Sequence, residues 1–96
     1  MNSTEIIERL RTEMPVLKTR YGVEEIGVFG SYARNDTKQS SDLDVLVKFH
    51  HPTFLNLAGL LNYLEKVFHI KVDITTKHEH LSPRFLQAIQ KEIIYA

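Results

Sequence analysis

The 96-residue sequence contains no cysteine and no long apolar run. The lack of cysteine excludes disulfide bonds, thiolate catalysis and cysteine-ligated zinc or iron–sulfur centres. No apolar stretch approaches the roughly 20 residues that span a bilayer, and the polar start MNSTEIIERLR lacks the apolar core of a signal peptide. We therefore expect a soluble, cytoplasmic protein without a membrane partner.

The sequence also lacks an excess of charge of either sign. Twelve Lys and Arg residues balance twelve Asp and Glu residues, and the isoelectric point is near 7.0. A protein that binds nucleic acid through its phosphates carries a general positive field, so nucleic acid is not expected as a direct ligand. Hydrophobic residues make up 43% and charged residues 25%, which is typical of a globular protein. With no repeat or linker-like stretch, residues 1–96 are expected to form one small domain.

Hydrophobic periodicity predicts alternating helices and strands. A helix over residues 2–21 begins with a capping box, and we expect Pro15 to break or kink it. Further helices are predicted over 53–68 and 82–93, and strands over 25–29, 43–49 and 70–75. The order α-β-β-α-β-α indicates an α/β (α+β) fold in which helices cover a small mixed β-sheet.

Three aspartates lie on the predicted strands. Asp42 and Asp44 are two residues apart at the start of a strand, so their side chains leave the same face of the sheet. Two facing carboxylates repel each other unless one is protonated, solvent screens them or a divalent cation lies between them. If the strand that holds Asp73 neighbours this one, at a spacing of about 4.8 Å, three carboxylates converge. Such an all-oxygen site suits magnesium or manganese.

Gly30 and Ser31 follow the strand 25–29. A glycine that closes a strand lets a ligand approach the backbone, and a serine that caps a helical turn leaves free amides facing outward. A phosphate cradle beside a carboxylate metal site is what nucleotidyl transfer from a nucleoside triphosphate requires. Two metal ions about 3.5–4 Å apart would hold the attacking oxygen and the leaving pyrophosphate.

The run GSYAR, followed by SDLDVLV and a later VD, resembles the polymerase-β-like nucleotidyltransferase superfamily. In particular it is similar to the minimal nucleotidyltransferases (MNT), short proteins that pair as antitoxins with HEPN-domain toxins. The resemblance implies that Gly30 and Ser31 contact the triphosphate of ATP and that Asp42 and Asp44 bind two Mg²⁺ ions. It also implies that Asp73 binds the catalytic metal ion and activates the acceptor hydroxyl.

The same resemblance gives Arg34 a role in stabilising the local structure or the phosphate charge. A simpler role for Arg34 is an ion pair with Asp36 or Asp42. Family members carry glycine where this sequence has Asn35. Asparagine tolerates the left-handed conformation better than other non-glycine residues, so the turn is expected to persist.

The resemblance implies transfer of AMP from ATP to a hydroxyl, in particular a tyrosine, of a cognate HEPN toxin in a hetero-oligomer. Only 23 residues follow the third aspartate, which leaves little room for an acceptor pocket, so the acceptor is expected on another chain. Two alternatives remain open. One is an antitoxin that neutralises its partner by binding alone. The other is an aminoglycoside-type enzyme in which a homodimer supplies the acceptor cleft.

Overall fold

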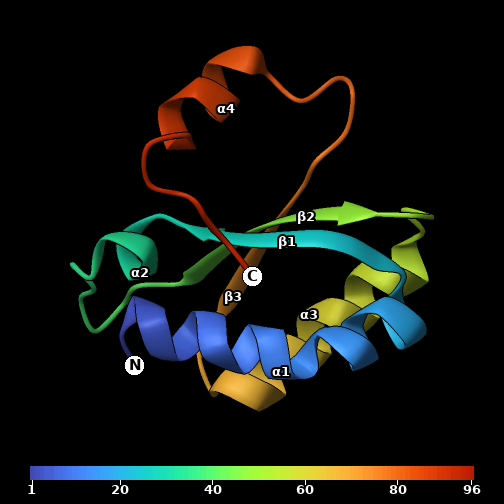
Figure 1. Cartoon of the computed structure of the whole chain (residues 1–96), viewed down its shortest axis with the longest axis horizontal. Helices are drawn as coiled ribbons and strands as arrows, with labels where there is room; N and C mark the ends of the chain where they lie inside the picture. The colour runs from blue at the N-terminus through green and yellow to red at the C-terminus, as the bar shows by residue number, and fades with distance from the viewer.

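The computed structural model describes all 96 residues, Met1–Ala96. Helices and strands alternate in the order α1 (Ser3–Tyr21), β1 (Val23–Phe29), α2 (Ser31–Arg34), β2 (Leu43–Phe49), α3 (Phe54–Phe68), β3 (Val72–Thr76), α4 (Pro83–Ile89) and β4 (Ile94–Tyr95). Figure 1 shows α1 and α3 on one side of the sheet and α4 on the other. The predicted fold class, a small mixed sheet with helices on it, is confirmed.

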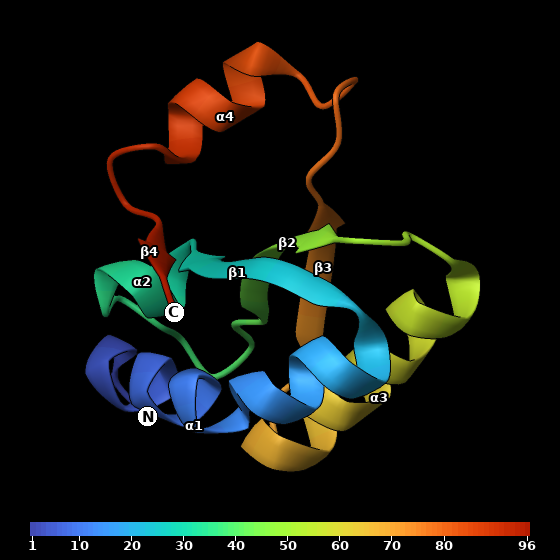
Figure 2. The same ribbon diagram turned by 45° about the vertical axis from the view of Figure 1, so that its right-hand side comes forward.

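The four strands are arranged in the order β3-β2-β1-β4. β2 runs antiparallel to β1 and parallel to β3, and β4 pairs antiparallel with β1 (Figure 2). The crossover from β2 to β3 passes through α3, as a parallel connection requires. The carboxyl end of β1 and the amino ends of β2 and β3 therefore meet at one end of the sheet, since Phe29 pairs with Asp44 and Asp44 with Asp73.

Helix α1 has the ends that its sequence predicts. The side chain of Asn2 accepts a hydrogen bond from the Glu5 amide at 2.9 Å, and the Glu5 carboxylate accepts one from the Asn2 amide at 3.1 Å. The helix ends at Gly22, whose φ of 69° is left-handed. The predicted break at Pro15 is wrong, because the helix is continuous through it. A proline removes only one amide donor, and the packing of the apolar face of α1 on the sheet outweighs that loss.

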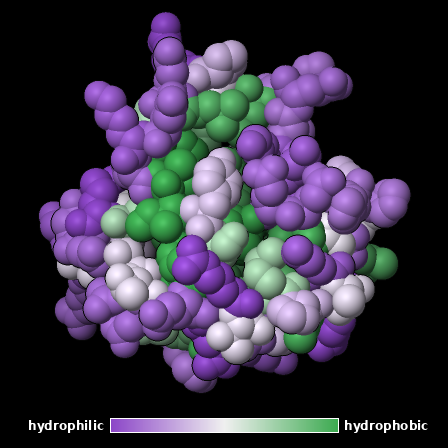
Figure 3. All heavy atoms as spheres, in the orientation of Figure 1, coloured by the Kyte–Doolittle hydropathy of each residue, from purple (hydrophilic) through white to green (hydrophobic).

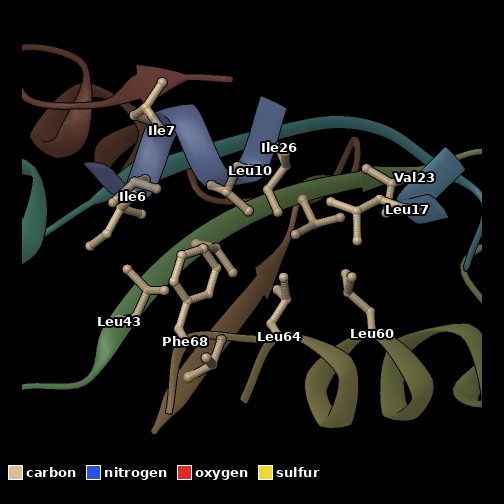
Figure 4. Packing of buried hydrophobic residues seen from close by; sticks show 14 of the residues in the cluster. Ile6, Ile7, Leu10, Leu17, Val23, Ile26, Leu43, Leu60, Leu64 and Phe68 are labelled. Atoms are coloured by element: carbon tan, nitrogen blue, oxygen red, sulfur yellow. The ribbon is translucent and has the colours of Figure 1, made fainter. Parts of the chain in front are cut away.

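The main core lies between the sheet and the two helices α1 and α3. In Figure 4, Leu10 and Leu17 of α1 and Leu60 and Leu64 of α3 point toward the strands. All four are fully buried, as are Val45 and Val47 and other alternate residues of the strands. Because this face of the sheet is filled with aliphatic side chains, the remaining alternate residues, including Asp44, face the side of α4.

The C-terminal segment differs most from its prediction. The helix predicted to reach Ile93 ends at Ile89, and the short strand β4 follows at Ile94–Tyr95. A second, smaller apolar cluster holds α4 against the sheet, with Phe29, Leu46 and Ile89 buried in it. None of the helices is long and apolar enough to cross a membrane.

Candidate active site

Asp44 and Asp73 lie side by side on neighbouring strands. They are direct register partners in the parallel pair β2–β3, with Leu43 opposite Val72 before them and Val45 opposite Ile74 after them. Parallel strands are about 4.8 Å apart, and partner residues point to the same face. The expected convergence of these two carboxylates is therefore present in the backbone. Asp44 is half-buried, whereas Asp73, on the edge strand, is exposed.

Asp42 lies just before β2, two residues from Asp44. Its charge acts on Asp44, but no group of three His, Cys, Asp or Glu side chains lies close enough to hold a metal ion in this arrangement. The three aspartates thus lie at the same end of the sheet, but their side chains are not close enough together to bind one metal ion.

The surroundings of Asp44 disfavour its negative charge. Burial raises the pKa of Asp44, and the negative charges of Asp73, Asp42 and Glu92 raise it further, while Arg34 lowers it. A raised pKa means that the ionised form of the Asp44 carboxylate is less stable here than in water. A divalent cation would relieve this repulsion, so the donor set fits a hard metal ion that oxygen atoms coordinate.

Gly30 occupies a backbone position that only glycine fits. Its φ of 74° and ψ of −155° belong to a region that residues with a side chain avoid. A Cβ atom at this position would collide with the carboxylate of Asp44. The sharp turn at Gly30 therefore lets Ser31, the first residue of α2, start a helical turn directly beside Asp44.

Arg34, at the end of the same turn, pairs with two carboxylates. Its Nε donates to Asp36 at 3.0 Å, which is one of the two ion pairs expected for this arginine. Its Nη1 donates to both carboxylate oxygens of Glu92, at 3.1 and 3.0 Å. The hydrogen bonds with Asp36 and Glu92 raise the pKa of Arg34, so the guanidinium stays charged.

Asn35 ends the turn in the left-handed conformation, with φ of 58°, as predicted. Its side chain also fixes the turn to the first helix. The Asn35 Oδ1 accepts from the Ser3 amide at 2.8 Å, and its Nδ2 donates to the Ser3 hydroxyl at 3.0 Å. Asn35 has less backbone freedom than the glycine expected from the family resemblance, but its side chain adds two hydrogen bonds with α1.

Glu92 is the residue of this site that sequence reasoning missed. It accepts a hydrogen bond from the Gly30 amide in addition to its bonds with Arg34. Glu92 falls within the helix predicted over 82–93, and that prediction does not connect it with the site. The signal that could have found it is the apolar, β-branched run that follows, Ile93–Ile94–Tyr95, which indicates a strand and hence a return to the sheet.

One cavity borders this end of the sheet. It has a volume of about 360 Å³, lies beside Asp42 and is also lined by Tyr32 and Lys71. A second cavity, of about 470 Å³, lies between α4 and the sheet and is lined by Leu46 and Lys77 but by none of the three aspartates. Figure 3 shows apolar atoms gathered below α4, where this second cavity lies.

Comparison with known proteins identifies the family. Residues 7–96 match the sequence profile of the family described as "Nucleotidyltransferase domain". The chain belongs to this nucleotidyltransferase family. It is 38% identical over 92 residues to the protein adenylyltransferase MntA of Thermococcus cleftensis, an alignment that covers 95% of this chain and 92% of that relative.

Solved structures agree with this membership. One structure, provisionally described as a minimal nucleotidyltransferase, superposes with a TM-score of 0.78 at 33% identity, over 98% of this chain and 95% of the other. The MNT antitoxin seen in complex with the tri-AMPylated HEPN toxin of Shewanella oneidensis superposes with a TM-score of 0.57 at 21% identity, over 98% of this chain and 67% of the other. The first likeness supports the family, and the second shows that the fold is the same.

Proposed function

We propose that this nucleotidyltransferase is a protein adenylyltransferase that transfers AMP from ATP to a partner protein. The observation that carries the proposal is the register pairing of Asp44 with Asp73 directly beside the glycine turn at Gly30. Two carboxylates that repel each other therefore lie next to the backbone amides at the start of α2. The name of the T. cleftensis relative supports protein adenylylation in particular.

In this proposal Asp42, Asp44 and Asp73 hold two divalent ions, Mg²⁺ or Mn²⁺. When bound, these ions would orient the attacking oxygen and neutralise the leaving pyrophosphate. The raised pKa of Asp44 supports this assignment, because cations would convert the repulsion among the carboxylates into attraction. Gly30, Ser31 and Arg34 contribute a backbone amide, a hydroxyl and a guanidinium to the triphosphate.

The transfer step is an in-line displacement at the α-phosphorus of ATP. The acceptor hydroxyl oxygen forms a bond to this phosphorus, and the bond to the bridging oxygen of the β-phosphate breaks. Pyrophosphate leaves with that electron pair, and the hydroxyl proton passes to Asp73. Because the Asp73 side chain is exposed at the edge of the sheet, it can deliver the proton to solvent.

The acceptor comes from another chain. We assign it to a tyrosine hydroxyl of a HEPN-domain toxin, which this protein would modify and silence as its antitoxin within a hetero-oligomer. The support is the MNT antitoxin of the same fold, whose structure holds an AMPylated HEPN toxin. Residues 1–96 would then act as one minimal nucleotidyltransferase domain.

Incubating the protein and its co-purified HEPN partner with α-³²P-labelled ATP and Mg²⁺ tests the proposal. The partner should become labelled, and the double variant Asp42→Asn, Asp44→Asn should abolish the label. A double variant at two exposed glutamates, Glu8→Gln with Glu79→Gln, removes the same charge far from the site and should leave labelling intact. An unlabelled partner, or equal labelling by the Asp double variant, would refute catalysis. If that Asp variant also still protected cells from the toxin, the protein would neutralise its partner by binding alone.

A further inference from the structure

Glu92 already occupies the donors that the proposed function gives to ATP. Its carboxylate accepts from the amide of Gly30 and from Nη1 of Arg34, the latter through both oxygens at 3.1 and 3.0 Å. The Glu92 side chain is 21% exposed and that of Arg34 is 48% exposed, so the ion pair lies near the surface, whereas the contact with the Gly30 amide is partly buried. The Glu92 carboxylate thus contacts both ends of the turn, the Gly30 amide at its start and the Arg34 side chain at its end.

A carboxylate and a phosphate compete for the same donors. Both are anionic acceptors that bind backbone amides and guanidinium groups with charge-assisted hydrogen bonds. An amide has one proton, so the Gly30 amide cannot fully serve Glu92 and a phosphate oxygen at once. The charge of Glu92 also acts on Asp44, which places a further negative group next to the carboxylates that would face the triphosphate.

We propose that Glu92 occupies the hydrogen-bond donors of Gly30 and Arg34 in the free protein and that the triphosphate of the nucleotide displaces Glu92 on binding. This inference rests on the proposed function and specifies how its site is regulated. Glu92 acts as an internal competitor, because every nucleotide that binds must first separate it from Gly30 and Arg34. The affinity for nucleotide is then lower than the site would have with a neutral residue at position 92.

The position of Glu92 in the chain indicates what moves. It lies in the turn between the end of α4 and β4, where the amides of Glu92 and Ile93 donate to the Ile89 carbonyl at 3.0 and 2.9 Å. Helix α4 has its own apolar contacts with the sheet, including the edge-to-face pair Phe29–Phe85 with ring centroids 5.6 Å apart. Displacement of Glu92 therefore loosens residues 90–93 and leaves α4 in place.

Binding of inorganic triphosphate and of α,β-methylene ATP, each with Mg²⁺, tests the competition by titration calorimetry. Glu92→Gln keeps the size and a neutral acceptor for Gly30 but removes the ion pair with Arg34. We expect this variant to bind both ligands about three- to tenfold more tightly, as the loss of one partly exposed charge-assisted contact predicts. The control Glu79→Gln, which removes an exposed charge before α4, should bind like the wild type.

Trypsin cleavage after the exposed Lys91 gives a second readout, which a change in overall stability alone would not reproduce. In the wild type, addition of triphosphate should accelerate this cleavage, because the next residue, Glu92, is released. In Glu92→Gln, cleavage should change little when ligand is added, and the effect of ligand within each protein is compared because glutamine after Lys91 itself speeds cleavage by trypsin. A thermal unfolding transition close to that of the wild type would show that the variant is folded.

Failure of this inference is distinguishable from failure of the proposed function. If neither the wild type nor Glu92→Gln binds either ligand, the proposed function is wrong. If the wild type binds both, but Glu92→Gln binds equally or more weakly, the internal competitor is refuted. Weaker binding would instead mean that Glu92 positions the turn for the phosphates. Cleavage after Lys91 that is unchanged by ligand in the wild type would also refute the displacement.

Discussion

Replacing Gly30 with alanine is expected to damage both the stability of the protein and the proposed metal site. The φ of 74° and ψ of −155° lie in a region that alanine reaches at a cost of about 1–3 kcal/mol. The added Cβ would also collide with the Asp44 carboxylate and lie 3.2 Å from Asp44 Cγ and 3.4 Å from its Cβ. The Oδ2 atom can rotate away from the new Cβ, but the Cγ atom at 3.2 Å must also move by a few tenths of an ångström, so the Asp44 carboxylate shifts.

Gly22→Ala is the matched control. Gly22 is also left-handed, with φ of 69° and ψ of 28°, and an alanine there costs about 1–2 kcal/mol. Its added Cβ would meet only the side-chain nitrogen Nδ2 of Asn56, at an ordinary contact distance of 3.4 Å. Both variants therefore carry backbone strain, but only Gly30→Ala displaces a residue of the candidate site.

Urea unfolding, Mn²⁺ titration and transfer of labelled AMP separate the two effects. Gly22→Ala should lose about 1–2 kcal/mol of unfolding free energy and keep the metal affinity and activity of the wild type. Gly30→Ala should lose at least as much stability and, under conditions where it is still folded, bind Mn²⁺ weakly and transfer no AMP. A folded Gly30→Ala protein with wild-type metal affinity and activity would refute the role assigned to this turn.

Two further substitutions probe the site and the core. Asp44→Asn should abolish AMP transfer yet raise the unfolding free energy at neutral pH, because burial and the neighbouring carboxylates raise the pKa of Asp44 and so disfavour its charged form. The folded-state pKa of Asp44 is raised, so this residue favours the fold below its ordinary pKa and loses that contribution as the pH rises through the raised value. The advantage of the variant, measured by thermal unfolding, should therefore disappear at acid pH, and an equal advantage at all pH values would contradict this. Leu64→Ala empties a fully buried position between α3 and the sheet and should cost about 2–5 kcal/mol in urea unfolding, whereas a loss below about 1 kcal/mol would contradict the packing described.

Local patterns were sufficient to predict most elements. The predicted capping hydrogen bonds are present, and the side chains that accept them are those of Asn2, Thr53 and Ser82. These were predictable because a cap joins residues only three apart in the sequence. The strand at 43–49 was predicted with its observed bounds, since a run of β-branched and apolar residues is a local signal as well. The juxtaposition of Asp44 and Asp73 depended on strand order, which the sequence left open and the parallel pairing of β2 with β3 decides.

What could not be predicted depends on contacts between distant residues. Pro15 stands inside a continuous helix because the tertiary packing of α1 outweighs the lost amide. The contact between Glu92 and Gly30 joins residues 62 apart in the sequence, and no spacing rule connects them. The same is true of Asn35 and Ser3, which are 32 apart. Side-chain pairs of this kind follow from the sheet topology, which has to be known first.

The crossover from β2 through α3 to β3 limits where the chain can change length. The 15 residues of α3 rise about 22 Å, close to the roughly 23 Å of the seven-residue strand β2, so the helix brings the chain back level with the start of that strand. A slip of β3 by one residue would turn Asp73 toward the aliphatic interior and Val72 outward. Insertions and deletions should therefore be tolerated at 36–40, in the exposed loop after α2, and excluded within α3, Phe54–Phe68, whose length returns the chain to the level at which Asp73 pairs with Asp44.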